Sequence, residues 1–106
     1  VTENLDEKKS DLKIDSDSFS VTWQGTALSL SAYEFRLLQT LSEQPGRVFS
    51  RRQLLEKAWD DPLAAMERTV DAHVKSLRAK FKEVTERELI VTHRGFGYSL
   101  DLRAGA

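Results

Sequence analysis

The 106-residue sequence contains no cysteine, and this absence excludes disulfide bonds and thiolate metal ligands. It has only two prolines, and no apolar run approaches the roughly 18 residues that indicate a membrane span. The first residues also lack the apolar core of a signal peptide. These absences together predict a cytoplasmic protein.

A chain of this length is sufficient for one hydrophobic core but not for two. The first ten residues mix charges of both signs with a single leucine, a composition typical of linkers. We therefore expect a flexible arm over residues 1–10, one domain over 11–103 and a short tail over 104–106.

The formal net charge of −1 gives no overall preference for an anionic partner, but the charges are unevenly distributed. Residues 1–18 carry six acids against three lysines. Residues 47–57 carry four bases against one acid, and residues 68–82 carry five bases against one acid. The middle of the chain can therefore present a local basic surface to phosphates.

Alternating apolar and polar residues over 12–14, 19–23 and 27–30 predict a small antiparallel sheet. Two capping boxes follow, Ser31 with Glu34 and Ser50 with Gln53, and each predicts the start of a helix. Pro45-Gly46 ends the first helix, and Asp60-Asp61-Pro62 ends the second.

A third helix is predicted over about residues 67–83, because Val70, Val74, Leu77 and Phe81 recur at helical spacing and form one apolar stripe. Its opposite face is polar and basic. This face combines cations, which bind phosphates, with short side chains, which can approach base edges.

Near the C-terminus, Gly95-Phe96-Gly97 lies between two apolar runs, 89–92 and 98–102. A dinucleotide-binding loop would need a third glycine that opens a helix, whereas here a strand pattern follows. The two glycines therefore indicate a hairpin turn that requires positive φ.

The second helix carries Arg51 and Arg52 near its start, the third carries a basic face, and the hairpin follows them; this combination predicts a winged helix-turn-helix domain of the α+β class that binds duplex DNA. The third helix would enter the major groove, and Arg94 at the hairpin tip would enter the minor groove. A winged-helix protein-interaction module without DNA binding is the main alternative, and a small hydrolase is a more distant one. No nucleophile and base pattern accompanies Asp71, and His73 and His93 lack further ligands at suitable spacing. We therefore expect neither an enzyme nor a metal or cofactor site.

Three segments, SAYEFRLLQTLSEQPGRVFSRRQLLEKAW, RTVDAHVKSLRAK and THRGFGYSL, resemble the DNA-binding effector domain of OmpR/PhoB-type response regulators. The resemblance runs from about Leu12 to Leu102 with the family's order and spacing. It implies a four-stranded N-terminal sheet, with a short extra strand near Asp15 to Ser18, then three helices and a C-terminal hairpin wing. It also implies a two-component phosphorelay, with an upstream receiver domain phosphorylated by a sensor kinase. Further partners that it implies are tandem DNA half-sites bound by a homodimer and RNA polymerase contacted through loop 60–66.

The same resemblance assigns roles to individual residues. It places phosphate contacts on Arg51, Trp59, Arg68, Thr69, Lys75 and Tyr98, and base contacts on Asp71, Ala72, Lys75 and Ser76. It places the wing contacts on Thr92, His93 and Arg94, while His73 and Arg78 flank the helix face as possible additional contacts. Two alternatives stay open, since Trp59 can serve packing instead of a phosphate, and Asp71 can orient an arginine instead of accepting from a cytosine amino group.

Overall fold

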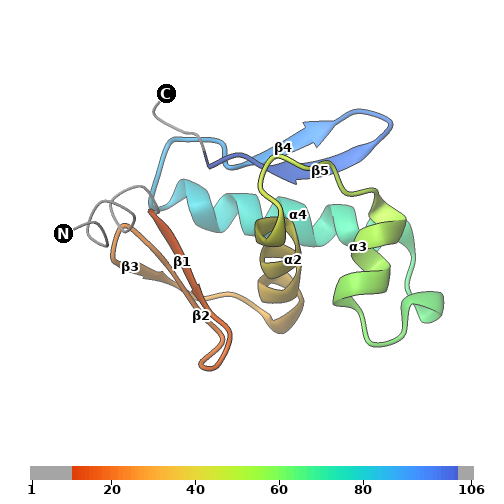
Figure 1. Cartoon of the computed structure of the whole chain (residues 1–106), viewed down its shortest axis with the longest axis horizontal. Coiled ribbons are helices and arrows are strands. Elements are labelled where there is room, and N and C mark those ends of the chain that lie inside the picture. The colour runs from red at the N-terminus through yellow and green to blue at the C-terminus, as the bar shows by residue number, and fades with distance from the viewer. Residues whose placement is uncertain (1–10, 103–106) are drawn as a thin grey trace.

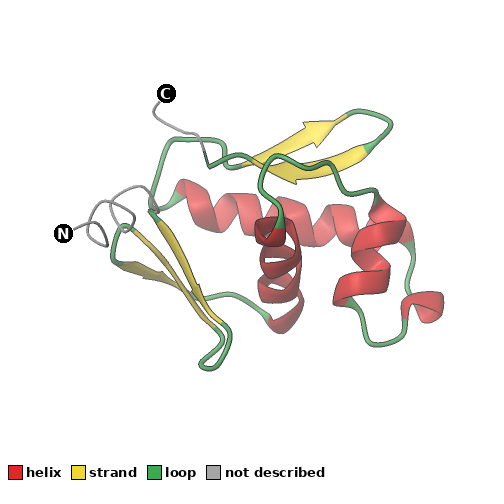
Figure 2. Cartoon of the chain, viewed as in Figure 1, coloured by secondary structure: helices red, strands yellow, loops and turns green. Residues whose placement is uncertain are grey.

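A computed structural model describes residues 11–102, so the predicted arm over 1–10 and the tail over 104–106 lie outside the described residues. A small N-terminal sheet lies at one end of a long helix, two shorter helices pack beside that helix, and a hairpin runs along it (Figure 1). Figure 2 shows the same order of sheet, helices and hairpin along the chain. This arrangement is the α+β winged helix that the sequence predicts.

Within residues 11–102, the N-terminal sheet has three antiparallel strands in the order β1-β2-β3. The predicted fourth strand near residues 15–18 is wrong, because this stretch is the turn between β1 and β2. The Asp15 carboxylate accepts hydrogen bonds from the backbone N–H groups of Asp17 (3.0 Å) and Ser18 (3.4 Å). Such local bonds by an aspartate stabilise a turn in place of a strand. The strands are β1 (Leu12–Asp15), β2 (Ser20–Trp23) and β3 (Thr26–Leu28).

Both predicted capping boxes are present. Ser31 Oγ accepts from the Glu34 amide at 3.2 Å while Glu34 Oε1 accepts from the Ser31 amide at 2.9 Å, and helix α2 begins there. Ser50 and Gln53 repeat the pattern at 3.1 and 2.9 Å, so each helix start satisfies two backbone donors that lack helical partners. The helices are α2 (Ala32–Glu43), α3 (Arg51–Ala58), the short 3₁₀ helix η1 (Pro62–Ala64) and α4 (Glu67–Lys82).

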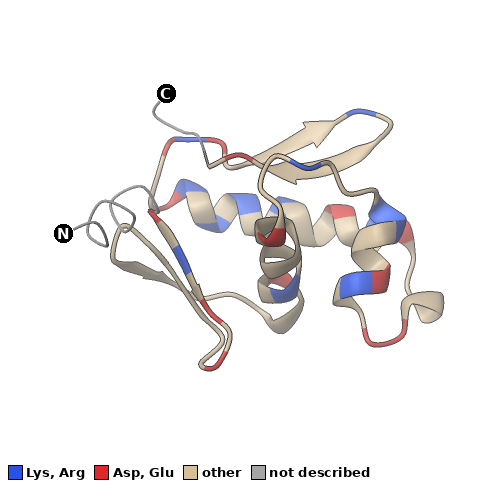
Figure 3. Cartoon of the chain, viewed as in Figure 1, with Lys and Arg blue, Asp and Glu red and all other residues tan. Residues whose placement is uncertain are grey.

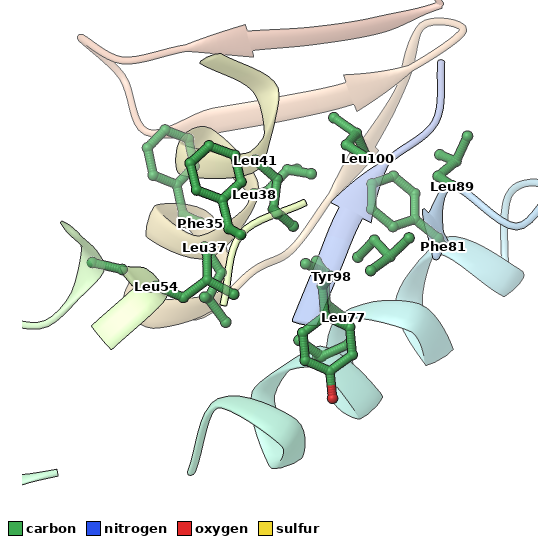
Figure 4. Packing of buried hydrophobic residues seen from close by; sticks show 14 of the residues in the cluster. Phe35, Leu37, Leu38, Leu41, Leu54, Leu77, Phe81, Leu89, Tyr98 and Leu100 are labelled. Atoms are coloured by element: carbon green, nitrogen blue, oxygen red, sulfur yellow. The ribbon is translucent and has the colours of Figure 1, made fainter. Parts of the chain in front are cut away.

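The apolar stripe of α4 lies in the core, as the sequence predicts. Val70, Val74, Leu77 and Phe81 are each 3% exposed or less. They join buried leucines of α2 and α3 and the buried side of the hairpin in one cluster (Figure 4). This packing orients the opposite face of α4 toward solvent.

The wing is formed by β4 (Ile90–His93) and β5 (Gly97–Leu100), paired antiparallel with Thr92 opposite Tyr98. The Phe96 amide donates to the His93 carbonyl at 2.8 Å, and Gly95 has a φ of 83° in this turn. Only the first glycine therefore serves the turn itself.

Gly97 has a different role. Tyr98 exchanges two backbone hydrogen bonds with Phe49, of 2.8 and 2.9 Å, which tie the wing to the segment before α3. A Cβ at Gly97 would lie 1.9 Å from the Phe49 carbonyl oxygen. The absence of a side chain therefore permits this close approach.

Candidate nucleic-acid interface

From Arg68 onward, the exposed residues of α4 form a single line at steps of four and three positions, while exposed Glu67 in the first turn pairs with Arg52 at 3.7 Å. We call this line the α4 stripe; its members are Arg68, Ala72, Lys75, Ala79 and Lys82. It contains three cations, two alanines and no acid. Figure 3 shows the Lys and Arg positions that recur along α4, with others at the start of α3 and at the wing tip. Of the predicted contact residues on α4, Arg68, Ala72 and Lys75 lie on this stripe.

A groove of about 610 Å³ runs between α4 and strand β4 of the wing. Its helix side is lined by Lys75, Arg78, Ala79 and Lys82, and its other side by Glu88, Val91 and Thr92. The groove connects the α4 stripe to the wing, so one ligand surface can contact both.

Asp71 lies beside the stripe and holds two other predicted contact residues. Its Oδ1 accepts a hydrogen bond from Arg51 Nε at 2.7 Å and a second from the Tyr98 hydroxyl. Burial raises the pKa of Asp71, but these two hydrogen bonds outweigh burial and leave the pKa below its usual range. Asp71 thus links α4, where it lies, to Arg51 of α3 and Tyr98 of the wing. This contact with Arg51 corresponds to the arginine-orienting alternative stated from the sequence.

Arg78 fixes the wing against α4. Its guanidinium donates to the Ile90 carbonyl at 2.9 and 3.2 Å and to the Thr92 hydroxyl, and it lies 5.7 Å from the centre of the Tyr98 ring. Arg78, predicted as an additional DNA contact, therefore donates a hydrogen bond to Thr92, predicted as a wing contact. This bonding sets the orientation of the hairpin relative to the helix.

Ser76 is turned toward α2. Its hydroxyl donates to Glu34 Oε2, while Glu34 Oε1 accepts from Lys80 Nζ at 2.6 Å. Glu34 is only 3% exposed, and although burial raises its pKa, the hydrogen bonds from Lys80, Ser76 and the Ser31 amide lower it below the usual range. The cap of α2 thus also anchors the second half of α4.

Trp59 packs in an aromatic cluster between α2 and α4. Its ring stacks on Tyr33 with centroids 4.6 Å apart and meets His73 edge-on at 5.4 Å. Its indole N–H has no hydrogen-bond partner among the residues that the structure describes. Packing and a phosphate contact are therefore compatible for this side chain. Thr69, half-buried on the same flank of α4, donates its amide to the Met66 carbonyl at 2.9 Å.

The wing tip exposes Arg94, while its neighbour His93 points elsewhere. His93 Nε2 lies 2.8 Å from the Ser99 hydroxyl and lines a separate hollow beside Pro45 and Gly46. Two features escaped the sequence interpretation: Lys82, which continues the stripe by the same spacing, and Glu34, whose partners come from distant parts of the chain. Extending the four-three spacing would have found Lys82.

No helix within residues 11–102 is long and apolar enough to cross a lipid bilayer. The same part of the chain contains no group of three or more His, Cys, Asp or Glu residues that could hold a metal ion.

Comparison with known proteins identifies the fold's relatives. Residues 25–100 match the family described as "Transcriptional regulatory protein, C terminal". The chain belongs to this family, the C-terminal effector domains of OmpR/PhoB-type response regulators. The predicted membership of the OmpR/PhoB family is thus confirmed.

Individual members of the family are similar over most of the chain. The transcriptional regulatory protein CreB of Escherichia coli K12 is 49% identical over 81 residues, which cover 76% of this chain and 35% of CreB. BaeR of E. coli O6:H1 is 45% identical over 91 residues, covering 85% of this chain and 38% of BaeR. The chain therefore spans less than half the length of these relatives.

A solved structure of the DNA-binding domain of the response regulator AdeR, in complex with an intercistronic region, superposes with a TM-score of 0.78. It is 36% identical and covers 87% of this chain and 94% of that chain. The DNA-binding domain of CpxR from E. coli superposes with a TM-score of 0.72 at 27% identity, covering 86% of this chain and 90% of that one. These OmpR/PhoB-type effector domains share the winged helix described above.

Proposed function

We propose that this chain is the sequence-specific, duplex-DNA-binding output domain of a two-component response regulator that regulates transcription. The observation that carries the proposal is the α4 stripe, a line of three cations and two alanines that borders a groove reaching the wing. One acid, Glu88, also lines this groove. A helix of 16 residues, about 24 Å long, fits the major groove, and the hairpin tip bearing Arg94 reaches the adjacent minor groove.

Of the residues predicted to contact phosphates, we assign direct contacts to Arg51, Trp59, Arg68, Thr69 and Lys75, and a positioning role to Tyr98. Arg68 and Lys75 have no ion-pair partner among the described residues, so their charges are available to phosphate. Arg51 is held by Asp71 with its side chain 35% exposed, which leaves its remaining N–H groups able to donate. Contacts of this kind fix the register of the protein on DNA, whereas base contacts supply the sequence preference.

Tyr98 has a narrower role in this assignment. Its side chain is buried, and its hydroxyl already donates to Asp71. The hydroxyl oxygen keeps a lone pair but no second proton, so it cannot donate to a phosphate without leaving Asp71. Tyr98 therefore acts mainly by positioning Asp71 and Arg51.

In the full-length protein the chain would follow a receiver domain phosphorylated by a sensor kinase and act in the cytoplasm. Two copies would bind tandem half-sites about one helical turn, roughly 10 base pairs, apart. Each copy then presents its stripe to the same face of the duplex.

Loop 60–66 supplies a surface for a protein partner, which we propose is RNA polymerase. Leu63 is 91% exposed and Met66 is 57% exposed, next to the acidic residues Asp60 and Asp61. Exposed apolar side chains beside acids suit a protein contact better than a polyanion. The loop extends from the end of α3 away from the wing (Figure 1).

Selection of bound duplexes from a random pool tests the proposal. The expected result is enrichment of one half-site, repeated in tandem at a spacing of about 10 to 11 base pairs. A winged-helix module that binds only protein would enrich no sequence and would show no salt-dependent retention of DNA.

A further inference from the structure

The polar side chains of α4 that face the wing and α2 are committed to partners within the protein. Asp71 accepts from Arg51 and Tyr98, Ser76 donates to Glu34, and Arg78 donates to Ile90 and Thr92. Base readout by any of them would break a hydrogen bond that holds α4 in place. Glu67 is exposed but pairs with Arg52 at 3.7 Å, and Thr69 and His73 are half-buried on the flank of the helix. The exposed side chains of α4 without a partner among the described residues are those of the α4 stripe.

The position of each α4 stripe residue along the helix reduces the number of candidates for base contact. The N-terminal half of a recognition helix is the part that contacts base edges, whereas Ala79 and Lys82 lie in its last turns. Within that half, Arg68 occupies the first turn, and Ala72 and Lys75 follow at exposed positions one turn apart. Ala72 is the only apolar side chain among these three residues.

The chemistry of Ala72 selects one kind of base. Its methyl group can neither donate nor accept a hydrogen bond, and the 5-methyl group of thymine is the apolar feature of base edges in the major groove. Opposite any other base, the methyl would displace water from a polar edge without replacing its hydrogen bonds. The inference that Ala72 meets a thymine rests on the proposed DNA binding and adds to it one base of the recognised sequence.

We propose that Ala72 is a specificity-determining residue that packs against the 5-methyl group of a thymine in each half-site. Asp71 and Ser76 do not read bases and instead position α4. Each half-site therefore contains one thymine that the protein prefers over other bases because of its methyl group, and not because of its hydrogen-bonding groups.

Replacement of thymine by uracil tests this directly, because it removes only the methyl group. In a duplex obtained by selection, each half-site thymine is replaced in turn, and affinity for the unchanged protein is measured by fluorescence anisotropy. One replacement should weaken binding by about fourfold, the effect of one buried methyl group. Uracil placed outside the half-sites serves as the DNA control and should have no effect.

Two matched protein variants test whether Ala72 is the residue that contacts this thymine methyl group. Ala72→Gly should remove the sensitivity to that uracil, while Ala79→Gly, which carries the same cost in helix propensity, should retain it. Circular dichroism checks that both variants keep their helix content. Equal binding of all uracil duplexes, or sensitivity that persists in Ala72→Gly, would overturn the proposal. Loss of all salt-dependent duplex binding by the unchanged protein would instead refute the proposed function itself.

Discussion

At the scale of single residues, the hydrogen bonds of Asp71 determine the position of Arg51. The Asp71 carboxylate lies beside the α4 stripe, and a free carboxylate there would repel phosphates. Its bonds to Arg51 and Tyr98 convert it into a support for a cation. The acid therefore favours DNA binding although its own charge has the wrong sign.

Asp71→Asn tests this supporting role. The amide keeps the shape but weakens the bond to Arg51, so affinity for a selected duplex should fall by about three- to tenfold. The preference for each base pair should stay the same, as measured by competition with singly substituted duplexes. If relaxation is confined to one cytosine-containing position, Asp71 reads that base and the supporting role is wrong.

The hydrogen bonds of the Glu34 carboxylate make the free energy of unfolding depend on pH. Because its pKa is lowered in the folded protein, the unfolded state binds more protons in mild acid, and this contribution is present above the usual glutamate pKa of about 4.3. It should be lost as the pH falls below that value. Glu34→Gln should cost about 1 to 3 kcal/mol at pH 7 in urea unfolding, because Lys80 loses a charged partner.

The difference between the two proteins should shrink as the pH falls below the usual glutamate pKa, because the stability contributed by the Glu34 charge is progressively lost there. A difference that stays constant from pH 7 to pH 3 would show that the charge of Glu34 contributes nothing to stability.

At the scale of elements, the wing depends on its attachment to the segment before α3. Phe49 pairs with Tyr98 through two backbone hydrogen bonds, and Gly97 makes this approach possible. Arg78 fixes the other strand to α4. Three parts of the chain thus set where Arg94 lies relative to the α4 stripe.

Gly97→Ala should destabilise the domain by about 2 to 4 kcal/mol, since the new Cβ meets the Phe49 carbonyl and the backbone φ of 145° disfavours a side chain. Gly95→Ala is the matched control: its φ is also positive, but nothing lies within 4 Å of the added Cβ. It should cost only about 1 kcal/mol. Equal losses for the two variants in thermal or urea unfolding would contradict the attachment role.

Elements and their order followed from the sequence because their signals are local. The capping boxes at Ser31 and Ser50 lie within four residues, and the apolar stripe of α4 lies within one helix. The strand near Asp15 to Ser18 was expected only from the resemblance to a four-stranded sheet, whereas the alternating residues indicated three strands, as the structure shows for residues 11–102. The partners of Asp71 and Ser76 come from 20 to 42 residues away, so helix periodicity could place both residues but could not reveal which way each was bonded.

At the scale of the whole molecule, positive charge is concentrated on one face and is not in net excess. The net charge is −1, yet the α4 stripe holds three cations without an acid. Acids gather in the turn between β1 and β2 and in the loop after α3 (Figure 3), while Glu88 is the acid that lines the groove beside the stripe. Binding to a polyanion therefore depends on one oriented face, and net charge alone would not indicate it.

The salt dependence of duplex binding tests the central claim most directly. Arg51, Arg68 and Lys75 would each neutralise a phosphate, so log Kobs should fall linearly with log salt concentration with a slope of about −3 per bound copy. Lys75→Ala should reduce the magnitude of that slope by about one unit, whereas Lys57→Ala, an exposed lysine on α3 that no contact role requires, should leave it unchanged. A slope near zero for the unchanged protein would contradict the account of this face as a DNA-binding surface.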